Sequence, residues 1–147
     1  MPLYMIYHPK GTFSTNEEKG ALAKDITALY TAIPLPAFYV NVIFMPLESD
    51  QIWIGGIPRP SPHSAANGPG GDTSIPFIRI TIEHIARALR TKEIRDSFLA
   101  RLDKALKPHI EDEGFDWEYS LDETSRDLWK VQGLVPPQTE TEAEREW

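Results

Sequence analysis

Proline at the second position of this 147-residue sequence is the residue with the most unusual chemistry. Methionine is commonly removed from a chain when the next residue is small, and Pro2 would then carry a secondary amine at the chain terminus. A neutral secondary amine can act as a general base or a nucleophile, provided that its pKa lies near the working pH. If Met1 is retained, the Pro2 nitrogen belongs to a peptide bond and can do neither.

Arg87 and Arg90 are the residues that could serve such an amine. A guanidinium binds a carboxylate through two parallel hydrogen bonds, so the pair suits a carboxylic acid substrate. A cation also lowers the pKa of a nearby amine. At about 6 Å and an effective dielectric of about 20, one arginine disfavours the protonated amine by roughly 3 kcal/mol, an upper bound of about two pKa units. An Arg-x-x-Arg pair alone is more often a solvated surface feature, and only its combination with Pro2 predicts a site.

The apolar patterns predict elements that could bring these residues together. Helical spacing and alternation indicate strands at 2–7, 38–44, 77–86 and 115–119, and helices at 14–33 and 91–106. They also indicate a short hairpin partner at 51–54 for the strand at 38–44, and a short helix within 121–132. The order predicts an α+β fold, in which two consecutive β-α-β units form a four-stranded sheet with two helices on one face. The other face would be left open, which predicts a symmetric oligomer.

Composition predicts one domain with a distinct end. We expect a single domain over 1–137, with halves at about 1–56 and 76–137 separated by a long mobile loop at 57–75 that is rich in Pro, Ser and Gly. Residues 138–147 are expected to form an acidic flexible tail, which contributes to the net charge of −7.

Several classes of function are disfavoured by the residue content. A net charge of −7 without a run of Lys and Arg argues against nucleic acid and anionic membranes as partners. The lack of cysteine excludes disulfides and thiolate chemistry, and the four histidines have no metal-ligand spacing, so we expect no metal and no cofactor. The amino-terminal residues contain no basic region followed by an apolar stretch, so a cytoplasmic location is expected.

Five short segments carry a family resemblance. They are Pro2 to Tyr7, Ala23 to Ala28, the Gly-Gly-Asp-Thr of Gly70 to Thr73, Arg87 to Leu102, and Trp117 to Tyr119. Together they resemble the cis-3-chloroacrylic acid dehalogenase-like members of the tautomerase superfamily, which also includes 4-oxalocrotonate tautomerase and macrophage migration inhibitory factor. The resemblance runs from Pro2 to about Pro137 and implies a homotrimer with a catalytic amino-terminal proline.

The resemblance also implies roles for individual residues. Pro2 falls on the catalytic proline of that family, Arg87 and Arg90 fall on its two carboxylate-binding arginines, and Tyr119 falls on a tyrosine that positions or activates water.

Two positions depart from the family pattern. Tyr30 stands where the dehalogenase has a histidine, and the best register puts Lys130 where it has a water-activating glutamate. A protonated lysine cannot take a proton from water, which makes efficient dehalogenation doubtful. Glu123 or Asp127 could fill that role if the register is shifted.

Two hypotheses of different classes follow. The first is a cofactor-independent tautomerase acting on small enol or 2-oxo carboxylic acids, with Tyr119 and Tyr30 as hydrogen-bond donors to the enolate and with weak hydratase or dehalogenase activity as a variant. The alternative is a non-catalytic trimeric scaffold or binding protein with the same fold. The changes at Tyr30 and Lys130 favour the alternative, whereas Pro2 and the two arginines oppose it.

Overall fold

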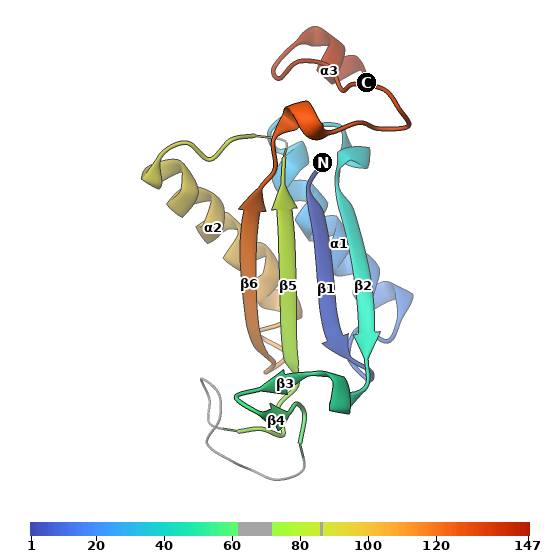
Figure 1. Cartoon of the computed structure of the whole chain (residues 1–147), viewed down its shortest axis with the longest axis vertical. Helices are drawn as coiled ribbons and strands as arrows, with labels where there is room; N and C mark the ends of the chain where they lie inside the picture. Colours follow the sequence, from blue (N-terminus) through green and yellow to red (C-terminus); the bar gives the residue numbers. More distant parts are fainter. Residues whose placement is uncertain (62–71, 86) are drawn as a thin grey trace.

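A four-stranded mixed sheet is the centre of the fold in the computed structural model, which describes residues 1–61, 72–85 and 87–147 (Figure 1). Its strands run in the order β2-β1-β5-β6, where β1 is Leu3–Pro9, β2 is Asn41–Leu47, β5 is Phe77–His84 and β6 is Asp116–Glu123. Strands β1 and β2 are parallel, β5 and β6 are parallel, and β1 and β5 are antiparallel. The expected pair of β-α-β units is confirmed.

Helices α1 (Asn16–Thr31) and α2 (Lys92–Leu106) both cover the same face of the sheet (Figure 1). The side chain of Thr15 accepts a hydrogen bond from the Glu18 amide at the start of α1, and Thr91 caps α2 in the same way. Each helix buries residues at four-residue steps, which are Leu22, Ile26 and Tyr30 in α1 and Phe98, Leu102 and Leu106 in α2.

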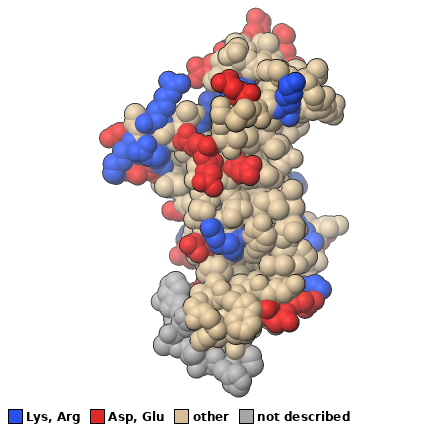
Figure 2. All heavy atoms as spheres, viewed as in Figure 1, with Lys and Arg blue, Asp and Glu red and all other residues tan. Residues whose placement is uncertain are grey.

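The two faces of the sheet differ in polarity. Tyr4 and Ile6 of β1 and Ile80 and Ile82 of β5 are buried under the helices. The opposite face has an apolar half over β1 and β2, to which Met5, Tyr7, Ile43 and Met45 contribute, and a polar half over β5 and β6. Figure 2 shows this open face, where charged side chains are sparse over β1 and β2.

A small second sheet lies beyond one end of the large one (Figure 1). Strand β3 (Trp53–Ile54) pairs with β4 (Ile57–Pro58) across Gly55 and Gly56, whose φ angles of 59° and 82° suit a tight two-residue turn. The predicted pairing of 51–54 with the strand at 38–44 is therefore wrong. That strand also begins later than predicted, at Asn41, because a 3₁₀ turn occupies Ala37–Tyr39.

The predicted short helix within 121–132 is wrong as well. Strand β6 continues to Glu123, because it pairs with β5 in parallel as far as His84. A single 3₁₀ turn at Arg126–Leu128 follows, and then an isolated bridge joins Val131 to Leu134. No described helix has the length and apolarity that crossing a membrane requires.

The loop and the tail were the two segments expected to lack order. Residues 62–71 of the 57–75 loop lie outside the described residues. In the described part of the loop before them, the side chain of Arg59 is fully buried and forms an ion pair with Asp116. The tail departs from the expected flexible form. Residues Glu142–Glu146 form helix α3, and the Glu144 side chain is 1% exposed.

Candidate functional site

The topology brings the chain terminus to the end of the sheet where β5 and β6 finish (Figure 1). Because β1 and β5 are antiparallel, Leu3 pairs with Glu83, and in the parallel pair His84 lies opposite Glu123. Pro2 is buried, and its carbonyl accepts a hydrogen bond of 2.9 Å from the Asn41 amide. The residue expected to do the chemistry is thus held firmly beside the segments that follow β5 and β6.

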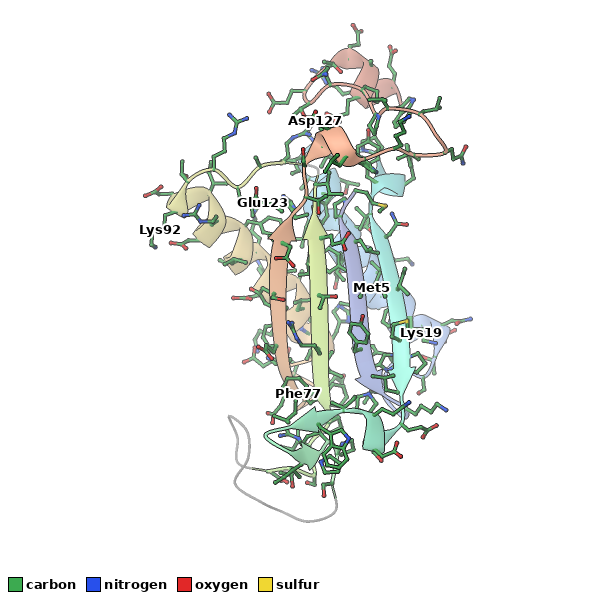
Figure 3. The ribbon with its side chains drawn as sticks, viewed as in Figure 1. Met5, Lys19, Phe77, Lys92, Glu123 and Asp127 are labelled. Carbon is green, nitrogen blue, oxygen red and sulfur yellow. The ribbon has the colours of Figure 1, made fainter. Side chains whose placement is uncertain are left out.

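A cleft of about 620 Å³ opens at this end of the molecule. Its walls come from the ends of β5 and β6 and from the segment that leads to α3, and its charged lining residues are Arg87, Arg90, Glu123, Arg126 and Glu140. Figure 3 shows Glu123 where β6 ends. The three arginines outnumber the two carboxylates of this lining, which favours the binding of a small anion.

The terminal amine itself is in surroundings that disfavour a positive charge. Burial and the nearby Arg126 lower the pKa of the Met1 amine to about 5. His84 is close enough for the same amine to lower its pKa, although burial is the main cause. The Met1 amine is therefore neutral at neutral pH, and a Pro2 amine released by removal of Met1 would lie beside the same cation.

Glu144 of α3 connects two of the arginines. Arg87 Nη2 donates to Glu144 Oε2 at 2.9 Å and Arg87 Nη1 to Oε1 at 3.3 Å, while Arg126 Nη2 donates to Oε1 at 3.1 Å. The Glu140 amide completes the set at 2.9 Å. Burial raises the pKa of Glu144, but hydrogen bonds from Arg87 and Glu140 outweigh it and lower the pKa, so the carboxyl group is ionised.

A buried hydrogen-bond chain supports the backbone of Arg87 from behind. His84 Nε2 lies 2.5 Å from the Arg87 carbonyl oxygen, which can only accept, so Nε2 carries the proton. His84 Nδ1 then accepts from the Tyr30 hydroxyl at 3.3 Å, and Tyr30 accepts from the Tyr4 hydroxyl at 2.9 Å. Burial raises the pKa of Tyr30 to about 12, so its hydroxyl stays protonated. Tyr30 is 0% exposed and belongs to the core behind the cleft.

Tyr119 lies away from the cleft. Its hydroxyl donates to Asp103 of α2 at 2.6 Å, and burial, followed by this carboxylate, raises its pKa well above the usual value. It is not among the residues that line the cleft.

The three candidates for a water-activating residue separate clearly. Glu123 lines the cleft, and its Oε1 accepts a hydrogen bond of 3.0 Å from the Leu89 amide. Asp127 lies on the 3₁₀ turn after β6 (Figure 3), and Lys130 is exposed; neither contributes to the cleft lining.

Sequence reasoning missed three residues of this region: His84, Arg126 and Glu144. Glu123 and Arg126 are three residues apart in the segment after the last predicted strand, and that spacing was an available signal. His84 lies inside the predicted strand 77–86, where a histidine gives no particular signal. Glu144 gave no local signal, because its partner Arg87 is 57 residues away in the chain.

No metal centre emerges from the part of the chain that the structure describes: there, no group of three His, Asp or Glu side chains is arranged as a metal site would require.

Comparison with known proteins identifies relatives of the whole chain. The profile of a family described as "Putative oxalocrotonate tautomerase enzyme" matches residues 1–147. The crystal structure of a probable enzyme from the thermophilic fungus Aspergillus fumigatus is similar with 40% identity and a TM-score of 0.83, over 100% of this chain and 92% of that one.

More distant structures share the fold. Native RhCC from Rhodococcus jostii RHA1 is 34% identical with a TM-score of 0.85, over 99% of this chain and 93% of that one. A fused 4-OT, described as an asymmetric trimer, is 20% identical with a TM-score of 0.59, over 90% of this chain and 94% of that one. Among proteins with curated descriptions, none matches the chain.

Proposed function

Because the chain belongs to the oxalocrotonate tautomerase-like family, we propose that it is a cofactor-independent tautomerase whose base is Pro2 after removal of Met1. The substrate would be a small enol or 2-oxo carboxylic acid. The observation that carries this proposal is the position of the amino terminus, which is partly buried near Arg126 at the arginine-lined end of the sheet. These surroundings lower the pKa of the Met1 amine to about 5, and they would act in the same direction on a Pro2 amine released by removal of Met1.

The proposed reaction moves one proton from oxygen to carbon. Arg90, together with Arg87, holds the substrate carboxylate. The neutral Pro2 nitrogen takes the proton from the enol hydroxyl, and the oxygen forms a carbonyl as the electron pair of the carbon–carbon double bond accepts a proton from the pyrrolidinium. Arg126 adds positive charge beside the enolate oxygen.

Tyr30 acts indirectly in this proposal. Its hydroxyl is fully buried and engaged with Tyr4 and His84, so it supports the Arg87 backbone and does not donate directly to the enolate. Tyr119 donates to Asp103 of α2 and does not line the cleft, so it has no direct contact with the substrate in this proposal.

We further propose that the protein is a homotrimer. The support is the apolar half of the open sheet face, with Ile43 43% and Met45 38% exposed, which a partner subunit would cover. The trimeric assembly of the fused 4-OT with the same fold agrees with this proposal.

Hydration of an activated three-carbon acid, or weak dehalogenation, is a second candidate activity. Glu123 favours it, because a carboxylate in the cleft can take a proton from water where Lys130 could not. Pro2 would then act as the general acid in the water-adding step.

Two measurements test the proposed tautomerase. Intact-mass analysis establishes whether Met1 is removed, and an ultraviolet assay follows the ketonisation of phenylenolpyruvate. We expect Pro2→Ala to lower kcat/KM by about 100-fold or more, because the secondary amine is the base. Full activity of Pro2→Ala would refute the proline mechanism, and retention of Met1 would do the same. Retention of Met1 without ketonisation activity would leave the non-catalytic scaffold as the function.

A further inference from the structure

We propose that Glu144 is a built-in carboxylate that makes the site selective for substrates with a single carboxylate. This inference rests on the proposed function and names a residue outside the set expected to act on the substrate. The carboxylate of Glu144 comes from α3, at the far end of the chain from Pro2, and takes up part of the positive charge of the cleft.

The geometry shows how this charge is shared. Arg87 and Arg126 both line the cleft and both bind Glu144, whose side chain is 1% exposed behind them. The side chains of the two arginines are 18% and 22% exposed, so each reaches the cleft while its other edge is neutralised.

Arg90 is different from the other two arginines. It lines the same cleft and is exposed, and within residues 1–61, 72–85 and 87–147 no hydrogen bond or ion pair engages it. Its full charge and all of its donors are available to a substrate carboxylate. The cleft thus offers one uncompensated arginine and two that already share an anion.

The cleft lining carries three arginines and two carboxylates, Glu123 and Glu140. Glu144 adds a third carboxylate behind two of these arginines. A substrate with one carboxylate adds one negative charge, which Arg90 binds together with Arg87. A second carboxylate on the same substrate would be left with Arg126, which shares Glu144 with Arg87, and repulsion by Glu144 would weaken its binding.

The architecture of α3 supports a role for Glu144 beyond holding the tail. The helix has only five residues, too few to be stable alone, and Glu144 is its only buried side chain. Burial of a carboxylate carries a desolvation cost that an apolar anchor avoids. The tail already has an apolar anchor in Trp147, whose ring packs 5.8 Å from that of Phe38.

The direct test compares two enols that differ in one group. Phenylenolpyruvate and enol-oxaloacetate share the same enol and first carboxylate, but carry a phenyl ring and a second carboxylate, respectively. We expect Glu144→Gln, which keeps the size of the side chain, to raise the kcat/KM ratio of enol-oxaloacetate over phenylenolpyruvate about 10-fold or more. Glu146→Gln, which removes one exposed charge from the same helix, is the matched control and should leave the ratio unchanged.

A binding measurement separates this inference from the proposed function. Calorimetry with adipate and hexanoate, which have equal length and two or one carboxylates, needs no turnover. Glu144→Gln should lower the Kd for adipate about 10-fold and the Kd for hexanoate less than about 2-fold. If the wild-type protein turns over neither enol, the proposed function fails, while the adipate-to-hexanoate comparison still tests Glu144.

Two results would overturn the inference. An equal rise of kcat/KM for both enols in Glu144→Gln would mean that Glu144 weakens the binding of the first carboxylate. An equal fall of kcat/KM would mean that Glu144 only supports the structure of the site. If Glu144→Gln does not fold, Arg126→Gln gives the reverse test. The ratio of kcat/KM for enol-oxaloacetate to kcat/KM for phenylenolpyruvate should fall in this variant, and an unchanged or higher ratio would refute the selectivity.

Discussion

Each end of the sheet has an ion pair between an arginine and a carboxylate, but opposite partners are buried. At the β3–β4 end, the Arg59 side chain is 0% exposed and Asp116 is 15% exposed. At the cleft end, Glu144 is 1% exposed and Arg87 is 18% exposed. An arginine buried with its carboxylate serves the fold. An arginine whose carboxylate is buried behind it still presents donors to the cleft, where a ligand can use them.

The environment of Arg59 agrees with a structural role. Its Nε donates to the Ile75 carbonyl at 3.1 Å, and its guanidinium lies 5.9 Å from the centre of the Phe77 ring. These contacts tie the β3–β4 end to the start of β5 and β6. The cleft arginines instead belong to segments that follow their strands, where side chains can point away from the core.

Replacement of Arg59 should give the largest effect on stability. Arg59→Met leaves Asp116 without its ion-pair partner, and we expect the free energy of unfolding to fall by about 3 kcal/mol in urea titrations. Lys10→Met is the control: its partner Glu48 is exposed, so the loss should not exceed about 1 kcal/mol. Equal losses in the two variants would contradict the structural role of Arg59.

Replacement of Arg90 should show the opposite pattern, with a loss of activity and none of stability. Arg90→Met removes charged hydrogen bonds to the substrate, each contributing about 1.5–3 kcal/mol, so kcat/KM for phenylenolpyruvate should fall about 10- to 100-fold. The urea midpoint should stay unchanged, because Arg90 is exposed. A lower midpoint with unchanged kcat/KM would assign Arg90 to the fold.

The pH dependence should reveal the charge at the cleft end. Burial and then Arg126 lower the pKa of the Met1 amine, and the Pro2 amine would lie beside the same cation once Met1 is removed. The base must be neutral, so kcat/KM should fall at acidic pH, as the pH drops through the lowered pKa of the Pro2 amine. In Arg126→Gln a nearby cation is lost, the pKa rises, and the acidic limb of the pH–rate profile should move to higher pH. A limb that moves to lower pH, or stays in place, would contradict this electrostatic role.

Acidic pH should loosen helix α3, and this is the smallest of the expected effects. Hydrogen bonds to Glu144 hold its pKa below the usual 4.5 despite burial. The stability that this group contributes is present above pH 4.5 and is lost as the pH falls through the lower folded-state pKa. Hydrogen exchange of the amides in 142–146 should accelerate in that range. The same acceleration in Glu144→Gln would contradict the assignment to Glu144.

The sequence predicted the fold well because the elements are periodic. Leu22 and Ile26, or Phe98 and Leu102, repeat at helical spacing, and a capped helix between two strands permits few topologies. The same periodicity put Arg87 and Arg90 just after a clear strand, and both line the cleft, while their role stays a prediction. It failed at 121–132, because the end of β6 is decided by pairing with β5 and not by local pattern.

The contents of the site were harder to predict. Choosing among Glu123, Asp127 and Lys130 required the end of β6, which fixes Glu123 opposite His84. The ion pair of Glu144 with Arg87 depends on a fold of the tail that its acidic composition did not suggest. The helical spacing of Tyr30 was equally compatible with a core position and with a site position. The structure buries Tyr30 completely between α1 and the sheet, which is a core position.

The meeting of both chain ends at one end of the sheet has a practical consequence for protein engineering. An affinity tag fused before Met1 would block the terminal amine, and a tag fused after Trp147 would crowd the contacts of its ring with Phe38 and Tyr39. The exposed turn at 111–114, between α2 and β6, lies at the opposite end of the sheet and is a more suitable place for an inserted epitope or a surface tether.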